Sequence, residues 1–220
     1  MVSTIRKIPP SGEFFLVVFI AFGYFIYLSS WWIGNPPNEP VKYVYSNIDC
    51  LRILIQELIT LFFLGWFLWI RGWKISHLRI RISWRSIVGG ILLWAIYFSI
   101  YMLIFSIVVD LIGGHEIFDR VSFEARLNPA LALIFIVVNS IFEEILVVGY
   151  VIQALEAKHG IVFAIGVSVF IRLLYHTYQG PLAAVSIIPL GLIFGIVYWR
   201  WRNLVPIIVA HTTMNGLALS

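Results

Sequence analysis

The sequence predicts an all-α fold, a polytopic membrane helix bundle of about seven transmembrane helices. Its 220 residues are 61% hydrophobic and 12% charged, and the mean hydropathy is +0.95. A soluble domain is about half apolar and about a quarter charged. The chain also divides into seven apolar stretches, each long enough to cross a bilayer as a helix. Residues 1–220 are therefore predicted to form a single integral-membrane domain of a multi-pass protein in the cell membrane.

The predicted spans are separated by polar or basic segments. They cover residues 14–33, 51–70, 86–109, 130–152, 161–178, 181–199 and 203–219. An eighth helix is expected if the long third region divides. Residues 34–49 are Pro-rich and residues 113–129 mix charges, so both are expected to be loops. A signal peptide is the alternative for the first stretch, but Trp31, Trp32 and Pro36 follow it instead of a cleavage site.

Basic residues predict the orientation of the bundle. With the N-terminus inside, ten Lys and Arg residues lie on inner segments and four lie on outer ones. Inner loops are enriched in Lys and Arg, so this orientation is favoured, and seven spans place the C-terminus outside. The net charge of +4 does not indicate nucleic acid binding. Cys50 is the single cysteine, which excludes an intrachain disulfide and a thiol-based metal site.

Two adjacent acids, Glu143 and Glu144, stand in the middle of the fourth span. A carboxylate in hydrocarbon is costly and therefore indicates a functional site. The alternative is a structural polar contact within the bundle. Glu57, in the second span, is interpreted as structural.

Two later spans carry polar residues that could face the acids. Residues four apart share a helix face, so Arg172 lies with His176 and His211 lies with Asn215. Glu143 precedes His159 in the turn after the fourth span by 16 residues, and His176 follows it by 17. At about 1.5 Å per residue, both lie about 24–26 Å from that turn, at one depth in the outer half of the membrane. The two histidines could instead be core residues, and Asn215 could be an interhelical contact.

The acid pair, a histidine one helix later and His211-x-x-x-Asn215 resemble the CPBP family of intramembrane proteases, also called Abi. That family includes the type II CAAX prenyl endopeptidases and bacteriocin-processing or immunity proteins. The resemblance covers residues 130–220, which form the catalytic half of the domain. The family motifs are EExxxR and FxxxH, whereas this chain has Val148 and Arg172 at two of these positions. EEILVVGY and RLLYHTYQG resemble a bacterial variant of the family.

The resemblance implies an endopeptidase that hydrolyses a peptide bond in a membrane-associated substrate, either a prenylated CAAX-like protein or a peptide precursor. It implies that Glu143 and His176 activate water, with Glu144 in the same acidic dyad, while His211 and Asn215 stabilise the oxyanion. The expected partners are membrane lipid and that substrate. No cofactor is expected. The alternative is a zinc site made by Glu143, His176 and His211.

Supporting roles are expected for three residues of the fifth span. Arg172 is predicted to reach across and pair with Glu144, because Val148 leaves that acid without the motif arginine. The alternative places Arg172 at the membrane surface. Tyr175 and Gln179, with Tyr178, either bind substrate or lie at the interface.

Two other classes of function compete with an enzyme. A non-catalytic immunity or scaffold protein would keep the same fold. A proton-coupled transporter could use acids and histidines as a relay, but the sequence lacks the two matching, Gly- or Pro-broken halves expected of one.

Overall fold

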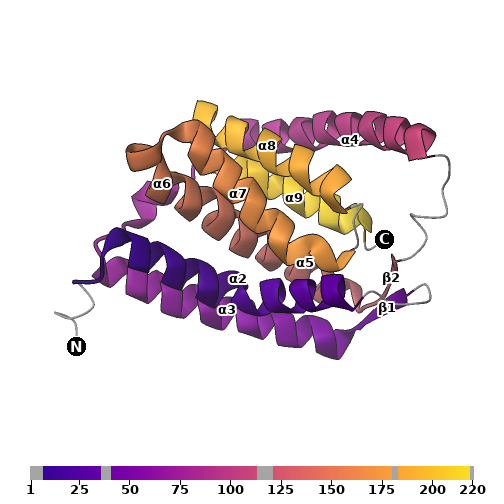
Figure 1. The fold of residues 1–220 in the computed structure, drawn as a ribbon, viewed down its shortest axis with the longest axis horizontal. Helices are drawn as coiled ribbons and strands as arrows, with labels where there is room; N and C mark the ends of the chain where they lie inside the picture. The colour runs from indigo at the N-terminus through magenta and orange to yellow at the C-terminus, as the bar shows by residue number, and fades with distance from the viewer. Residues whose placement is uncertain (1–6, 36–40, 113–120, 180–182, 219–220) are drawn as a thin grey trace.

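The structure, a computed structural model, describes residues 7–35, 41–112, 121–179 and 183–218. Within these residues seven helical rods form one bundle, which confirms the predicted all-α membrane fold (Figure 1). The fourth rod is continuous and consists of α5, the π-helical segment η2 and α6. The rods are α2 (Pro10–Gly34), α3 (Asn47–Ile70), α4 (Trp84–Ile112), α5 (Pro129–Glu143) with η2 (Glu144–Tyr150) and α6 (Val151–His159), α7 (Ile161–His176), α8 (Ala183–Trp201) and α9 (Val205–Ala218).

The outer faces of the bundle are apolar. Five rods, α2 to α7, are long and apolar enough to cross a membrane, and Val185–Trp201 is a shorter apolar helix. Large side chains such as Phe62 (70% exposed) and Leu103 (63% exposed) point outward from α3 and α4. Such faces are stable in lipid and not in water. The third region does not divide, because α4 is a single helix of 29 residues.

The two predicted loops each contain a strand, which corrects the sequence interpretation. β1 (Val41–Ser46) pairs in parallel with β2 (Val121–Arg126). β-branched and aromatic residues favour strands; they make up four of the six residues of β1, and β2 contributes Val121 and Phe123. Helix α3 also starts earlier than predicted, because Ser46 and Asp49 form a capping box at its N-terminus.

The helices of the bundle form three layers. Figure 1 shows α2 and α3 on one side, α4, α8 and α9 on the other, and α5, α6 and α7 between them. One apolar cluster packs α7, α8 and α9 against α4, and a second packs α2 against η2 and α7. The middle layer therefore contributes to both cores, and the acid pair lies at its centre.

The ends of the bundle differ. The start of α2 and the turn between α6 and α7 lie at one end, and the two strands lie with the end of α9 at the other (Figure 1). Only Gly160 links α6 to α7, and its φ of +82° suits glycine. The two helices form the antiparallel hairpin that the sequence predicts.

Candidate active site

The acid pair stands where the central rod changes from α- to π-helical geometry. Glu143 is the last residue of α5, and Glu144 is the first of η2. After the segment, the N–H of Val151 donates to the carbonyl of Leu146, five residues back. The carbonyl of Val147 accepts a hydrogen bond of 2.7 Å from Ser168 Oγ on α7. π-helical turns are rare and frequently mark functional sites. The apolar pattern of the sequence contains no sign of this one.

Glu144 is completely buried and forms the ion pair predicted with Arg172. Nη2 of Arg172 lies 2.8 Å from each carboxylate oxygen of Glu144. Nη1 of Arg172 lies 3.5 Å from Oε2 of Glu143, so one guanidinium serves both acids. Arg172 is itself 0% exposed, which rules out the surface position considered for it. Val148 lies in the apolar core, fully buried.

His211 is the second partner of Glu144. Its Nδ1 lies 2.6 Å from Oε1 of that carboxylate, and the imidazole is 3% exposed. A carboxylate only accepts hydrogen bonds, so this contact places a proton on Nδ1. Nε2 is then the ring nitrogen of His211 that this contact leaves unengaged.

A cavity of about 1020 Å³ lies inside the bundle, beside these residues. Glu143, His176, His211 and Asn215 all line it, so the structure brings four of the five predicted catalytic residues together. The fifth, Glu144, lies outside the lining, buried behind His211. The sequence left open whether three further residues bind substrate or lie at the membrane interface. All three line the cavity: Tyr175, Tyr178 and Gln179. The cavity reaches Asp49, at the end of the bundle that carries the strands.

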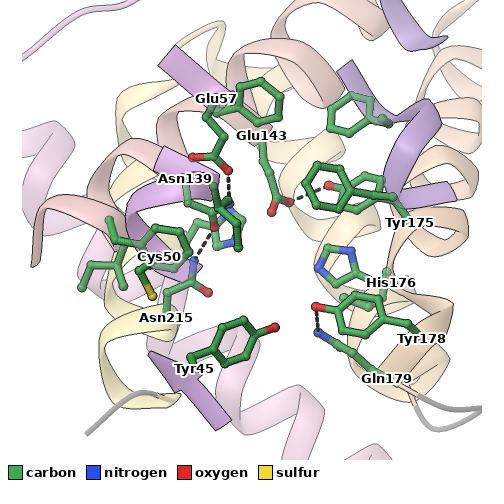
Figure 2. A pocket seen from close by; sticks show the side chains of 18 of the residues that line it. Tyr45, Cys50, Glu57, Asn139, Glu143, Tyr175, His176, Tyr178, Gln179 and Asn215 are labelled. Atoms are coloured by element: carbon green, nitrogen blue, oxygen red, sulfur yellow. Dashed lines mark hydrogen bonds between the residues drawn. The ribbon is translucent and has the colours of Figure 1, made fainter. Parts of the chain in front are cut away.

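The Glu143 carboxylate points toward Tyr175 on the cavity wall (Figure 2). The hydroxyl of Tyr175 donates a hydrogen bond of 2.5 Å to Glu143 Oε2. The ring of Tyr175 stacks on Phe22 of α2, with the centroids 4.7 Å apart. His176 lies next to it, with its ring centroid 4.5 Å from that of Tyr175, and its Nδ1 has no side-chain hydrogen-bond partner among the described residues. Tyr175 therefore orients the acid, and the imidazole of His176 lies beside it on the cavity wall.

Asn215 belongs to a hydrogen-bonded chain that sequence reasoning missed. Its Nδ2 donates to Oδ1 of Asn139 at 3.2 Å, and Nδ2 of Asn139 donates to Oε1 of Glu57 at 2.7 Å. All three residues line the cavity, and Figure 2 shows them across it from His176. A lone acid in the apolar span of α3 was the available signal.

Residues 125–217 match the family described as type II CAAX prenyl endopeptidase Rce1-like. The match confirms the resemblance to CAAX-type intramembrane proteases, and together with the long apolar helices it identifies a multi-pass integral membrane protein. No curated protein and no solved structure matches the chain.

The Rce1-like segment contains every predicted site residue, from Glu143 to Asn215. Two parts of the cavity wall precede this segment: Glu57 on α3, and the rings of Phe22 and Phe25 on α2. The cavity therefore depends on helices from outside the matched segment as well.

The arrangement does not fit the zinc alternative. Within the described part of the chain, no three His, Cys, Asp or Glu side chains are grouped so that they could hold a metal ion. His211 Nδ1 is engaged by Glu144, and Glu143 Oε2 is engaged by Tyr175. We therefore derive no step through a metal.

Proposed function

We propose that this chain is an intramembrane endopeptidase that hydrolyses a peptide bond of a membrane-associated substrate, either a prenylated CAAX-like protein or a peptide precursor. One observation carries the proposal: Glu143, His176, His211 and Asn215, from three rods, line one cavity inside the bundle. The match of residues 125–217 to the family of Rce1-like type II CAAX prenyl endopeptidases supports the reaction class. Lipid and a lipid-associated substrate are the partners that such a cavity would meet.

Peptide hydrolysis without a nucleophilic side chain needs an activated water. Glu143 is the proposed general base, because its carboxylate faces the cavity and lies beside the Arg172 guanidinium, which favours the ionised form. His176 would share this water, and the proton that Glu143 takes from it would pass through His176 to the leaving amine. Tyr175 holds Glu143 in place by its hydrogen bond.

The tetrahedral intermediate needs donors for its oxyanion. Nε2 of His211 and Asn215 are proposed for this role. Nδ2 of Asn215 donates to Asn139 and, over 3.5 Å, to Ser140, so it would exchange the longer of these bonds for the oxyanion. Since Nδ1 of His211 is bonded to Glu144, donation from Nε2 requires the doubly protonated imidazolium. Glu144 is thus assigned as a positioning residue that supports the charge of His211 and binds Arg172, rather than as a group that touches substrate.

Comparative proteomics of membrane peptides tests the proposal. Cells with wild-type protein are compared with cells carrying Glu143→Gln, and Asp110→Asn on the exposed surface of α4 serves as an acid-to-amide control. A peptide that accumulates in Glu143→Gln cells alone supports the enzyme. An unchanged peptide set and phenotype, at equal protein level, would favour the scaffold function.

The metal-free mechanism has its own test. Purified protein should keep its activity after incubation with 1,10-phenanthroline. Activity that is lost to the chelator and regained with zinc contradicts a glutamate mechanism and requires a metal site.

A further inference from the structure

Two exposed polar side chains of α3, a helix that precedes the matched segment, line the cavity. Arg52 and Gln56 are four residues apart and therefore lie on one face of this helix. A polar group in an apolar span is costly unless water or a ligand satisfies it. Among the described residues, neither side chain forms a hydrogen bond with another residue. Both can therefore bind polar groups of a molecule that occupies the cavity.

The neighbouring carboxylate of Asp49 engages Arg52 only weakly. Oδ2 of Asp49 accepts hydrogen bonds from the hydroxyl of Ser46, at 2.6 Å, and from its N–H, at 3.2 Å. Nη1 of Arg52 lies 3.9 Å from the other oxygen, beyond hydrogen-bond distance, and the arginine side chain is 77% exposed. Such exposed contacts contribute little, so the guanidinium retains its planar set of N–H donors for a second carboxylate.

The charges on the cavity wall leave one position for an anionic group. Arg52 is the single Lys or Arg among the described residues of that wall. Three acids line the same cavity: Asp49, Glu57 and Glu143. An anionic group of a substrate is repelled by carboxylates and gains a counter-ion only beside the guanidinium. The wall thus favours an anion at the end of the cavity that lies toward the strands.

The contact between α3 and α5 gives the depth of this position. Each helix follows directly on one strand of the parallel pair β1 and β2, so both run in the same direction. Glu57 and Asn139 are hydrogen-bonded at 2.7 Å and mark one level. Arg52 lies five residues outward of this level and Glu143 four residues inward, so about 13 Å separates them along the bundle. An extended peptide rises about 3.3 Å per residue, and about four residues span this distance.

We propose that Arg52 binds a carboxylate of the substrate about four residues from the scissile bond, while Gln56, between the two levels, pairs with the substrate backbone. The inference rests on the proposed function and adds to it a specificity-determining residue from outside the matched segment. A C-terminal carboxylate and an acidic side chain offer the same chemistry, so both sources are compared.

Peptide binding to the full-length Glu143→Gln chain separates recognition from cleavage. A fluorescein-labelled farnesylated peptide is titrated in maltoside micelles and followed by fluorescence anisotropy. It is used in three forms: with a free C-terminal carboxylate, as the carboxamide, and as a carboxamide whose last residue is glutamate. Adding Arg52→Gln should raise the Kd of the free acid about 3–10-fold and leave that of the plain carboxamide unchanged. A matching loss with the glutamate peptide identifies a side-chain carboxylate as a second source.

Two further variants separate this contact from general effects. Arg85→Gln removes an exposed arginine that does not line the cavity, so every Kd should match that of the parent chain. Gln56→Leu should raise the Kd of all three peptides alike, because the proposed contact is to the backbone. Mass spectrometry of the products that the wild-type chain releases should place the cleaved bond about four residues from the favoured carboxylate.

The inference alone is overturned if Arg52→Gln leaves the Kd of the free acid unchanged, or raises the Kd of all three peptides equally. An effect of Arg52→Gln that appears only in phosphatidylglycerol vesicles also overturns it, because the guanidinium then binds lipid phosphate. Peptides that bind through Arg52 but are not cleaved by the wild-type chain contradict the proposed function and leave the anion site standing.

Discussion

The buried pair of Arg172 and Glu144 allows stability to be separated from activity. Both side chains are fully buried, with two contacts of 2.8 Å between them. Removing one partner of a buried ion pair costs about 3–5 kcal/mol, because the other charge is left uncompensated. Arg172→Met keeps much of the volume and removes the charge. For a chain of this size, such a loss corresponds to a fall in Tm of about 6–20 °C.

Removing both charges should reverse most of that loss. In Arg172→Met/Glu144→Gln no charge of the pair is left, and replacing a whole buried pair is often neutral. The amide oxygen of Gln can still accept the bond from His211. Activity should stay low, because Glu143 also loses the guanidinium that lies 3.5 Å from it.

The assay is thermal unfolding in detergent, followed by tryptophan fluorescence at one fixed scan rate, with peptide cleavage measured on the same samples. Glu144→Gln alone completes the cycle. The reasoning is refuted if Arg172→Met has the same Tm as wild type, or if the Tm of the double variant is as low as that of Arg172→Met. Recovery of full activity in the double variant would show that the ion pair has no part in the reaction.

Three further predictions follow from single contacts. Gly90→Ala should lower both Tm and activity, at a cost of about 1–3 kcal/mol, because its Cβ would lie 2.5 Å from Cβ of Val209 and 2.7 Å from the carbonyl oxygen of Pro206 on α9. Gly89→Ala, with no atom within 4 Å, is the control and should match wild type. Tyr175→Phe keeps the ring stacked on Phe22 but removes the hydrogen bond to Glu143, so kcat should fall about 10–100-fold with a small change in Tm, and an unchanged kcat would contradict its orienting role. In a Cys50→Ser background, a membrane-impermeant maleimide should label Lys158→Cys from the inner side and Ile48→Cys from the outer side; labelling of both from one side contradicts the predicted topology.

Hydropathy was sufficient to predict the helices, because a span must be long and apolar whatever it packs against. It could not predict the ends of α3, which depend on the capping box of Ser46 and Asp49. The short strands β1 and β2 stabilise each other through pairing between distant segments, which no local pattern encodes. The same holds for η2, whose widened turn depends on packing against α7 and on Ser168.

The contacts of the site, too, could be predicted from the sequence only in part. The contact between Arg172 and Glu144 was predictable, because a tight turn forces α6 and α7 to be neighbours and residue counts then give the depth. The contact between Glu57 and Asn139 was not, since it depends on α3 lying beside α5, and no turn joins them. Glu144 was predicted as a catalytic member of the acidic dyad, but it is buried behind His211, where it contacts the imidazole and Arg172.

The tight hairpin of α6 and α7 has a consequence for how the protein is made. Helices enter the bilayer from the ribosome in chain order, and a charge at the centre of a single helix resists insertion by about 2.5–3.5 kcal/mol. Glu144 and Arg172 lie on the two arms joined by Gly160, so they can neutralise each other as soon as this hairpin leaves the translocon. Their pairing does not wait for α9, which brings His211 last. Glu144, the proposed support of His211, can thus have its counter-ion as soon as the hairpin is inserted.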